Sequence, residues 1–216
     1  MKNALIIGGT GLTGKKLTSL LLADKRYASV NLLVRKPVDI IYEKLYQIPF
    51  NFDKPDESKV QADEVFCCLG TTIKDAGSKK AFYQVDYEYV VTLANIAYKN
   101  GCKKFALISS MGANKNSTVF YSKTKGQVEE AIKAIGFDDC FIFRPSILLG
   151  TRRQSRLSES VGKIFLSKIS FLLPKKYRPI HSKSVAMAMQ FVMNGNFTGF
   201  KIFESDEIAT IATLTH

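Results

Sequence analysis

The chain has few of the side chains that build metal centres or disulfide frameworks. It contains two histidines and four cysteines among 216 residues. No cluster of histidine, cysteine and aspartate has the spacing of metal ligands, so we expect no metal site. Cys67, Cys68, Cys102 and Cys140 include no Cys-x-x-Cys pair. In a chain of this size they predict reduced, partly buried thiols and a cytoplasmic protein.

Long apolar runs, leader patterns and internal repeats are also lacking. No run approaches the ~18 apolar residues that a membrane-spanning helix needs, so we expect no transmembrane segment. Met1–Asn3 leads directly into the apolar run Ala4–Ile7, without the small-residue cleavage pattern of a secretory signal. No linker or low-complexity stretch divides the chain. The length therefore predicts one domain that spans residues 1–216.

Acidic residues are outnumbered, 19 against 31 basic ones, which gives a net charge of +12. Nine basic residues and one acid, Glu159, lie between residues 151 and 183. Such a segment is typical of a solvated face, or of a surface for an anionic ligand, an acidic membrane or a partner, including a second copy of the chain. We expect no nucleic-acid partner, because no helix-turn-helix, zinc-finger or RNA-recognition signature accompanies the charge. The nine residues are Arg152, Arg153, Arg156, Lys163, Lys168, Lys175, Lys176, Arg178 and Lys183.

Short apolar runs alternate with amphipathic segments of helical length. A continuously apolar run such as Ala4–Ile7 is typical of a strand buried on both faces. The alternation predicts an α/β fold, a doubly wound Rossmann-type parallel sheet with helices on both faces. The expected strands are 4–7, 30–34, 48–52, 65–69, 105–109, 140–144 and 199–204, and the expected helices are 12–23, 57–63, 79–99, 121–135 and 183–194.

The stretch from Gly150 to Pro179 interrupts this alternation. Its apolar residues form one helical stripe, with lysines and serines off it. Two interpretations compete: a helix that covers the substrate cleft, or a basic amphipathic helix on a membrane or partner. We favour the cleft cover, because more globular sequence follows. Residues 146–183 are thus expected to form a small C-terminal region over the substrate. The stripe consists of Leu157, Val161, Ile164, Phe165, Ile169 and Leu172.

A glycine cluster, Gly8-Gly9-Thr10-Gly11-Leu12-Thr13-Gly14, lies between the first predicted strand and the first predicted helix. It fits both Gly-x-Gly-x-x-Gly and the variant Gly-x-x-Gly-x-x-Gly. Both spacings let the backbone approach a pyrophosphate, which the first N–H groups and the positive end of the helix then hold. The position between a buried strand and an amphipathic helix makes this a strong indication of a dinucleotide site.

The end of the second predicted strand indicates which dinucleotide binds. A site for NAD places Asp or Glu roughly 20 residues after the glycines, to bind the ribose hydroxyls. This chain has Arg35 at 21 residues after Gly14, followed by Lys36, and no acid before Asp39. A guanidinium there can bind a 2′-phosphate with two parallel hydrogen bonds. We therefore expect NADP(H) to be preferred over NAD(H).

Two further segments are expected to contact the cofactor. Asp53 ends the third predicted strand, where its carboxylate accepts from the adenine amino group or simply belongs to a turn. Cys68-Leu69-Gly70-Thr71-Thr72 follows the fourth predicted strand, with a glycine for close approach and hydroxyls for hydrogen bonding. The whole predicted cofactor site is Gly8, Thr10, Gly11, Leu12, Thr13, Gly14, Arg35, Lys36, Asp53, Leu69, Gly70, Thr71, Thr72, Tyr121, Lys125 and Pro145.

Tyr121 and Lys125 are four residues apart and share one face of a predicted helix. An ammonium beside a phenol favours the phenolate, and such a phenol can protonate a carbonyl oxygen or take a proton from an alcohol. Ser109 ends the fifth predicted strand and Ser110 follows it, at the sheet edge where doubly wound folds bind ligands. We expect Ser110 to bind the same carbonyl, because neighbouring residues of a strand face opposite ways.

Together these motifs resemble the short-chain dehydrogenase/reductase superfamily, in its extended or atypical branch. Val85-Asp86-Tyr87-x-Tyr89-Val90, Ser109-Ser110-x-Gly112-Ala113, Phe143-Arg144-Pro145 and Arg152-x-x-Ser155-Arg156 narrow the resemblance to the Tat-interactive-protein-like oxidoreductases, from Lys2 to about Phe203. The resemblance implies NADP(H) binding through Gly8, Gly11, Gly14 and Arg35, and a Ser110–Tyr121–Lys125 triad. The chain departs from the superfamily's pattern at Asp86, where many members have a catalytic asparagine. His181 matches a stretch that lines the cleft in extended members.

Two functions follow as hypotheses. The first is a reductase that transfers hydride between NADPH and a small carbonyl or alcohol, with Tyr121 as acid and base. The second is a non-catalytic NADP(H)-binding redox sensor or scaffold, which the departure at Asp86 and the basic segment 151–183 favour.

Overall fold

We describe the protein from a computed structural model, which covers residues 1–150 and 174–214. Seven parallel strands form one sheet in the order β3-β2-β1-β4-β5-β6-β9. The order reverses beside β1, which lies between β2 and β4, as in doubly wound folds. The strands are β1 (Lys2–Ile7), β2 (Tyr27–Val34), β3 (Leu45–Pro49), β4 (Glu64–Cys67), β5 (Lys104–Ile108), β6 (Asp139–Arg144) and β9 (Gly199–Glu204).

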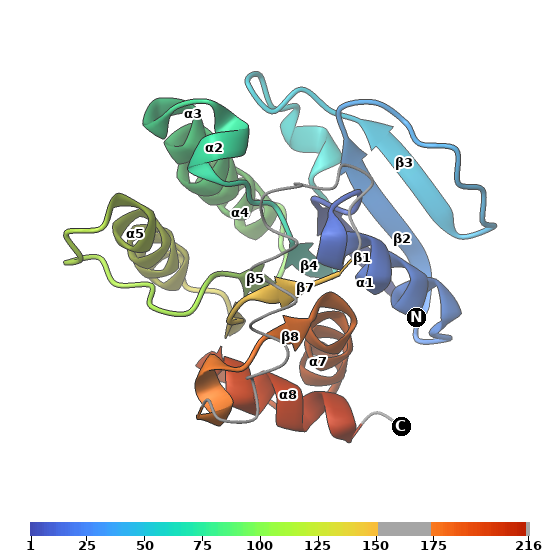
Figure 1. The fold of residues 1–216 in the computed structure, drawn as a ribbon. Coiled ribbons are helices and arrows are strands. Elements are labelled where there is room, and N and C mark those ends of the chain that lie inside the picture. Colours follow the sequence, from blue (N-terminus) through green and yellow to red (C-terminus); the bar gives the residue numbers. More distant parts are fainter. Residues whose placement is uncertain (151–173, 215–216) are drawn as a thin grey trace.

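Helices cover both faces of the sheet, and each face has its own apolar core (Figure 1). Successive residues of β1 show why: Ala4 and Ile6 belong to one core, and Leu5 and Ile7 to the other. The first core includes α1 (Leu12–Ala23), α7 (Ser182–Asn194) and α8 (Ser205–Thr213), and the second includes α4 (Tyr89–Lys99) and α5 (Phe120–Ile135). The predicted doubly wound α/β fold is confirmed.

Several predicted boundaries agree with the structure and others were wrong. The predicted helix 12–23 and strand 199–204 match α1 and β9. The strand predicted at 48–52 is β3, which begins earlier and ends at Pro49, because its register places Leu45 beside Val30 and Pro49 beside Val34. The helix predicted at 57–63 is a single 3₁₀ turn at Glu57–Lys59, whose start is capped by the Asp56 side chain.

The helical segment predicted at 79–99 is continuous but not uniform. It begins as α3 (Lys79–Tyr83), widens into a π-helical turn at Gln84–Glu88, and continues as α4. Such a turn inserts one extra residue and re-aims the side chains within it. Asp86 lies in the middle of this turn and is 1% exposed.

Sequence reasoning missed the last helix, α8, and several short elements. The short elements are α2 (Ile73–Ala76), the strand pair β7 (Leu148–Leu149) and β8 (Ile180–His181), and a 3₁₀ turn at Lys175–Tyr177. α8 carries a sequence signal that could have revealed it, because Glu204 and Glu207 form a capping box at its start. The predicted cleft-covering helix falls on 151–173 and lies outside the described residues.

Candidate active site

The glycine turn joins β1 to α1 at the carboxyl end of the sheet, beside the point where the strand order reverses. Gly8 has a φ of +79°, and a β-carbon there would lie 2.7 Å from the backbone nitrogen of Leu69. A β-carbon on Gly14 would lie 2.2 Å from the carbonyl oxygen of Gly8. The first turn of α1 therefore packs directly on the turn, with no room for side chains.

The start of α1 is suited to an anion. Its N-cap residue is Gly11, which has no side chain to accept a hydrogen bond from the N–H groups of the first turn. Thr10 and Gly11 are exposed, whereas Thr13 and Gly14 are buried in the helix–sheet contact. Free N–H groups at the positive end of a twelve-residue helix bind phosphate groups. This cradle fits the pyrophosphate of a dinucleotide.

Arg35 follows β2 and is exposed at the edge of the same region. Its guanidinium carbon lies 5.8 Å from the centre of the Phe52 ring, and Phe52 packs in turn against Tyr89 at 5.6 Å between ring centres. Lys36, also exposed, follows it. Arg35 is thus beside an aromatic surface that follows β3, the location predicted for the adenosine end of the cofactor.

Asp53 already has partners within the protein. Its Oδ1 accepts hydrogen bonds from the Tyr89 hydroxyl and, at 3.0 Å, from the Gln84 side chain. Partial burial, together with the bond to this carboxylate, raises the pKa of Tyr89. The structure thus ties Asp53 to the helix that follows β4. That Asp53 also accepts a hydrogen bond from the adenine amino group stays a prediction.

The segment after β4 runs beside the glycine turn. The backbone nitrogen of Cys68 donates to the carbonyl of Ile7 at 2.8 Å, which continues the β1–β4 pairing to the end of the strands. Thr71 donates its backbone N–H to Asp86 at 2.8 Å. The Thr72 hydroxyl accepts from the backbone of Asp75 and caps α2, so this predicted cofactor residue also has a local structural role.

Lys125 and Asp86 form an ion pair inside the protein. The Lys125 Nζ lies 2.7 Å from Oδ1 of Asp86, and the two side chains are 6% and 0% exposed. Burial by itself would lower the pKa of Lys125. The nearby Asp86 carboxylate and the Tyr121 phenol outweigh that effect, so the pKa of Lys125 is raised. The lysine therefore stays protonated, and its charge is balanced by Asp86.

Tyr121 lies in the first turn of α5, one helical turn before Lys125. Its ring is half-buried and packs against Phe82 of α3, with 5.4 Å between ring centres. Because both residues lie in α5, four positions apart, they share one face of the helix as predicted. Tyr121 thus combines partial accessibility with a buried cation beside it.

The two serines after β5 differ in their surroundings. Ser110 is half-buried, and its hydroxyl donates to the carbonyl of Met111 at 3.4 Å, a long and weak bond. Ser109 is 6% exposed, and its hydroxyl has no hydrogen-bond partner among the described residues. A buried hydroxyl without a partner is uncommon and calls for an explanation such as a ligand. Sequence reasoning favoured Ser110 and passed over Ser109.

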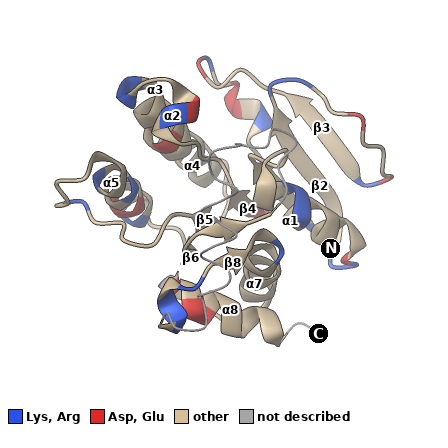
Figure 2. Ribbon diagram, in the orientation of Figure 1, with Lys and Arg blue, Asp and Glu red and all other residues tan. Residues whose placement is uncertain are grey.

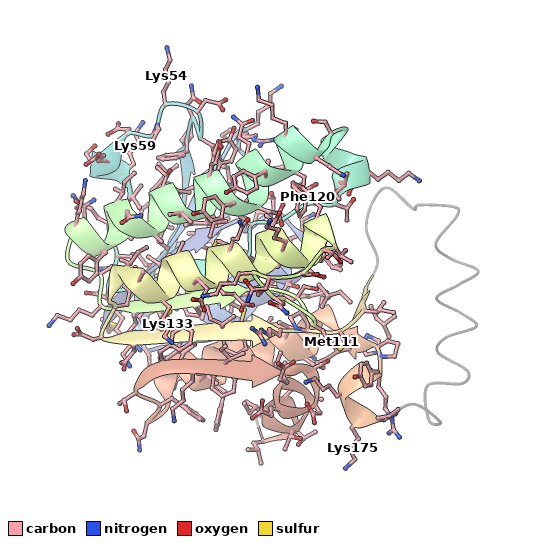
Figure 3. The ribbon with its side chains drawn as sticks, turned by 90° about the vertical axis from the view of Figure 1, so that its left-hand side faces the viewer. Lys54, Lys59, Met111, Phe120, Lys133 and Lys175 are labelled. Atoms are coloured by element: carbon pink, nitrogen blue, oxygen red, sulfur yellow. The ribbon has the colours of Figure 1, made fainter. Side chains whose placement is uncertain are left out.

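The loop that follows these serines packs on α5. The backbone nitrogen of Asn114 donates to the carbonyl of Ser122 at 3.0 Å. A β-carbon on Gly126 would lie 2.1 Å from the backbone nitrogen of Lys115, so only glycine lets the loop come this close. Figure 3 shows that Met111 and Phe120 lie at the same end of the molecule, whereas Lys133 lies at the other.

The structure joins several of the predicted site residues into two groups, and Ser110 is linked to neither among the described residues. The glycine turn, Leu69–Thr71, Lys125 and Tyr121 form a chain of neighbours around the ends of β1 and β4, with Asp86 at its centre. Arg35 and Asp53 form the second group, around Tyr89.

Pro145 is linked to the serine loop by a 3.0 Å bond from the Met111 backbone. His181 is exposed at the start of α7, where the structure shows no link to either group among the described residues.

Other features bear on partners. The described residues contain no group of three or more His, Cys, Asp or Glu placed to hold a metal ion. Within the same ranges, no helix is both long and apolar enough for a membrane span. All four cysteines are free thiols.

Of the basic residues of segment 151–183, the structure describes Lys175, Lys176, Arg178 and Lys183. Figure 2 shows the turn that contains Lys175 and Lys176 next to α8.

Comparison with known proteins gives consistent results. A family model described as NAD(P)H-binding matches residues 8–170. Protein HTATIP2 of Rattus norvegicus is 34% identical over 199 residues, which cover 89% of this chain and 80% of that protein. Protein FMP52, mitochondrial, of Candida albicans is 35% identical over 173 residues, 74% of each chain.

Solved structures with the same fold are more distant in sequence. A UDP-N-acetylglucosamine 4-epimerase from Methanobrevibacter ruminantium, in complex with UDP-N-acetylmuramic acid, has a TM-score of 0.72 at 18% identity, covering 94% of this chain and 76% of its own. The Bordetella bronchiseptica enzyme WbmH, in complex with NAD⁺, has a TM-score of 0.70 at 18% identity, covering 95% and 76%. At this identity they show the fold alone. The sequence motifs, the glycine cradle and the family match together show that this chain belongs to the NAD(P)H-binding family of Rossmann-type proteins.

Proposed function

We propose that the protein is an NADP(H)-dependent oxidoreductase that acts on a small carbonyl or alcohol, with Ser110, Tyr121 and Lys125 as its catalytic residues. The observation that carries this proposal is the buried Lys125 ammonium, held one helical turn from a half-buried Tyr121 and beside Gly70 of the segment that follows β4. When bound, the nicotinamide supplies or accepts the hydride. The chain's own residues have to bind the substrate oxygen and move one proton.

Tyr121 is the group proposed to move that proton. In reduction its phenol donates the proton to the carbonyl oxygen as hydride arrives at carbon, and in oxidation it takes the proton back from the alcohol. The Lys125 ammonium stabilises the phenolate that is left after donation. The Ser110 hydroxyl donates a hydrogen bond to the same oxygen and fixes its position. The weak bond that Ser110 makes to Met111 supports this role, because a ligand can replace it at little cost.

The cofactor is proposed to be NADP(H) rather than NAD(H). The exposed Arg35 guanidinium above Phe52 and the adjacent Lys36 support this choice, since both can bind a 2′-phosphate. We expect no acidic side chain to compete for the ribose at this position, since Arg35 and Lys36 are followed by Pro37 and Val38.

The proposal is tested by binding and turnover measured on the same preparations. We expect tight NADPH binding, and NADPH oxidation with at least one member of a panel of aldehydes and ketones. Tyr121→Phe should bind NADPH normally and lose turnover by about 10²–10⁴-fold, the usual contribution of a general acid. Tyr98→Phe, on the exposed end of α4, is the matched control and should keep full activity. NADPH binding without turnover across the panel would instead favour the sensor hypothesis.

The serine is tested in the same assay. Ser110→Ala should lower turnover, whereas Ser109→Ala should have a smaller effect. The unpartnered hydroxyl of Ser109 makes the comparison informative. Loss of turnover in Ser109→Ala alone would transfer the role of binding the carbonyl to Ser109.

Location and partners are proposals of the same kind. We propose a cytoplasmic protein, supported by four free thiols. The fungal relatives carry the word mitochondrial in their names, so fractionation of the producing cells has to distinguish the two compartments.

We also propose that the protein forms a homodimer or binds a protein partner through segment 151–183. Light scattering tests the dimer, and loss of association when the lysines and arginines of this segment are replaced by glutamine tests the segment.

A further inference from the structure

Asp86 is the least expected residue of the site. It lies in the π-helical turn at Gln84–Glu88, and its side chain is 0% exposed. Buried carboxylates are rare unless they are paired, and π-helical turns occur frequently at functional sites. The function proposed above gives this carboxylate no role.

One oxygen of the carboxylate belongs to an ion pair, and the other accepts a hydrogen bond. Oδ1 lies 2.7 Å from the Lys125 ammonium, and Oδ2 accepts a hydrogen bond from the backbone N–H of Thr71 at 2.8 Å. A β-carbon at Gly70 would lie 3.3 Å from Oδ1 and 3.5 Å from Nζ of Lys125, so the backbone of Gly70 passes close to the pair. Asp86 thus connects α5 to the segment that follows β4.

The ionisable groups around the pair come from three elements. Tyr121 and Lys125 belong to α5, Asp86 belongs to the π-helical turn, and Cys67 ends β4. Burial raises the pKa of Cys67 to about 12, so this thiol is neutral near pH 7. Among these groups, the charged ones near pH 7 are the Lys125 ammonium and the Asp86 carboxylate.

We propose that Asp86 is a positioning residue that holds the Lys125 ammonium and the Gly70–Thr71 backbone in one arrangement, so that Tyr121 faces a nearly neutral ion pair instead of a lone cation. The inference rests on the function proposed for Tyr121 and Lys125. It adds that the extent to which Lys125 favours the phenolate is set by a residue 39 positions away in the sequence. The geometry also couples the ammonium to the backbone that lines the predicted cofactor site.

Asp86→Asn tests this proposal, because it keeps the shape of the side chain and an oxygen for Thr71 but removes the negative charge. Tyr121 would then be next to an unbalanced ammonium, and its phenol should ionise at lower pH, by about one pH unit. The measurement is a pH titration by NMR of protein labelled with ¹³C at the tyrosine Cζ, with the Tyr121 signal assigned from Tyr121→Phe. An unchanged or higher midpoint would overturn the proposal.

Glu88→Gln is the matched control, because Glu88 is exposed at the end of the same π-helical turn and loses the same charge. It should leave the Tyr121 titration unchanged. An equal shift in both variants would mean that Tyr121 senses general charge, which contradicts a specific role for Asp86.

Asp86→Asn leaves the buried Lys125 without its ion-pair partner, which can prevent folding, so a second variant is needed. The double variant Asp86→Asn/Lys125→Gln removes both charges and leaves none unpaired. If Tyr121 faces a nearly neutral pair, its midpoint in the double variant should stay near that of the wild type. A clear rise would show that the ammonium acts on Tyr121 without compensation from Asp86, and the proposal would fail. The titrations need neither cofactor nor substrate, so their outcome is independent of whether the protein turns over.

Discussion

Gly14 packs against Gly8 so closely that a β-carbon on Gly14 would lie 2.2 Å from the Gly8 carbonyl oxygen. The contact sets the distance between the first turn of α1 and the end of β1. It therefore determines where the N–H groups of the helix point. A change at either glycine affects the cradle before it affects any catalytic group.

Gly14→Ala should consequently weaken NADPH binding by at least tenfold and destabilise the protein. Forcing a β-carbon into a packed contact costs about 1–3 kcal/mol, and here the opposing atom is backbone, which cannot rotate away. Fluorescence titration with NADPH and thermal unfolding check the two effects. Ser19→Ala, on the exposed side of the same helix, should change neither. Wild-type affinity in Gly14→Ala would contradict the role assigned to the cradle.

Arg35→Gln should reduce the affinity for NADPH and leave that for NADH nearly unchanged. Loss of a hydrogen bond to a charged group is worth about 1.5–3 kcal/mol, which corresponds to roughly 10–150-fold in the dissociation constant. Calorimetric titration with both cofactors measures the ratio. Lys25→Gln removes the same charge just after α1, at the end of that helix opposite the glycine turn, and serves as the control. An equal loss for both cofactors would show that Arg35 does not read the 2′-phosphate.

Gly126→Ala tests how the serine loop is held against α5. Alanine is favoured over glycine within a helix by about 1 kcal/mol, so helix propensity alone predicts stabilisation. The β-carbon would, however, lie 2.1 Å from the backbone nitrogen of Lys115, and relieving this overlap costs about 1–3 kcal/mol. We expect net destabilisation in chemical denaturation, together with reduced turnover. Lys123→Ala, exposed on the same helix, should be close to neutral in stability, and a stabilised Gly126→Ala would refute the contact.

Asp24 predicts a pH dependence of stability at the opposite end of α1. Partial burial would raise its pKa, but hydrogen bonds from Arg26 and from Gln190 of α7 lower the pKa from 3.8 to about 2. A carboxyl group with a lowered pKa stabilises the fold above its ordinary pKa, and this stabilisation is lost as the pH falls toward 2. Asp24→Asn should therefore lower the melting temperature at pH 7, with a difference that disappears near pH 2. Asp39→Asn, at an exposed position, should show no such difference.

Local patterns were enough for much of the fold and for part of the site. The apolar run Ala4–Ile7 and the stretch Leu12–Ala23 predicted β1 and α1, because a strand buried on two faces and an amphipathic helix leave clear periodicities. The spacing of Tyr121 and Lys125 placed both on one face of α5 for the same reason. The resemblance to an NAD(P)-binding family was confirmed by the family match and by HTATIP2. NADP(H) preference and the catalytic roles stay predictions.

Other features depended on contacts that no local pattern reports. The strand predicted at 48–52 was displaced from the observed β3, because the limits of β3 come from its pairing with β2. The importance of Gly126 was invisible, because a helical glycine becomes informative only when the loop that packs on it is known.

The sequence by itself determined the order of the main strands and most helices, the glycine turn and the helical face that carries Tyr121 and Lys125, because each depends on residues within a few positions of one another. The tertiary structure alone decided which group neutralises Lys125. Asp86 is distant in the chain, and the π-helical turn directs it inward to the ammonium and to the backbone of Thr71. Electrostatic interactions in a buried site depend on distances across the fold, and those distances exist only once the sheet has brought β4 and β5 together.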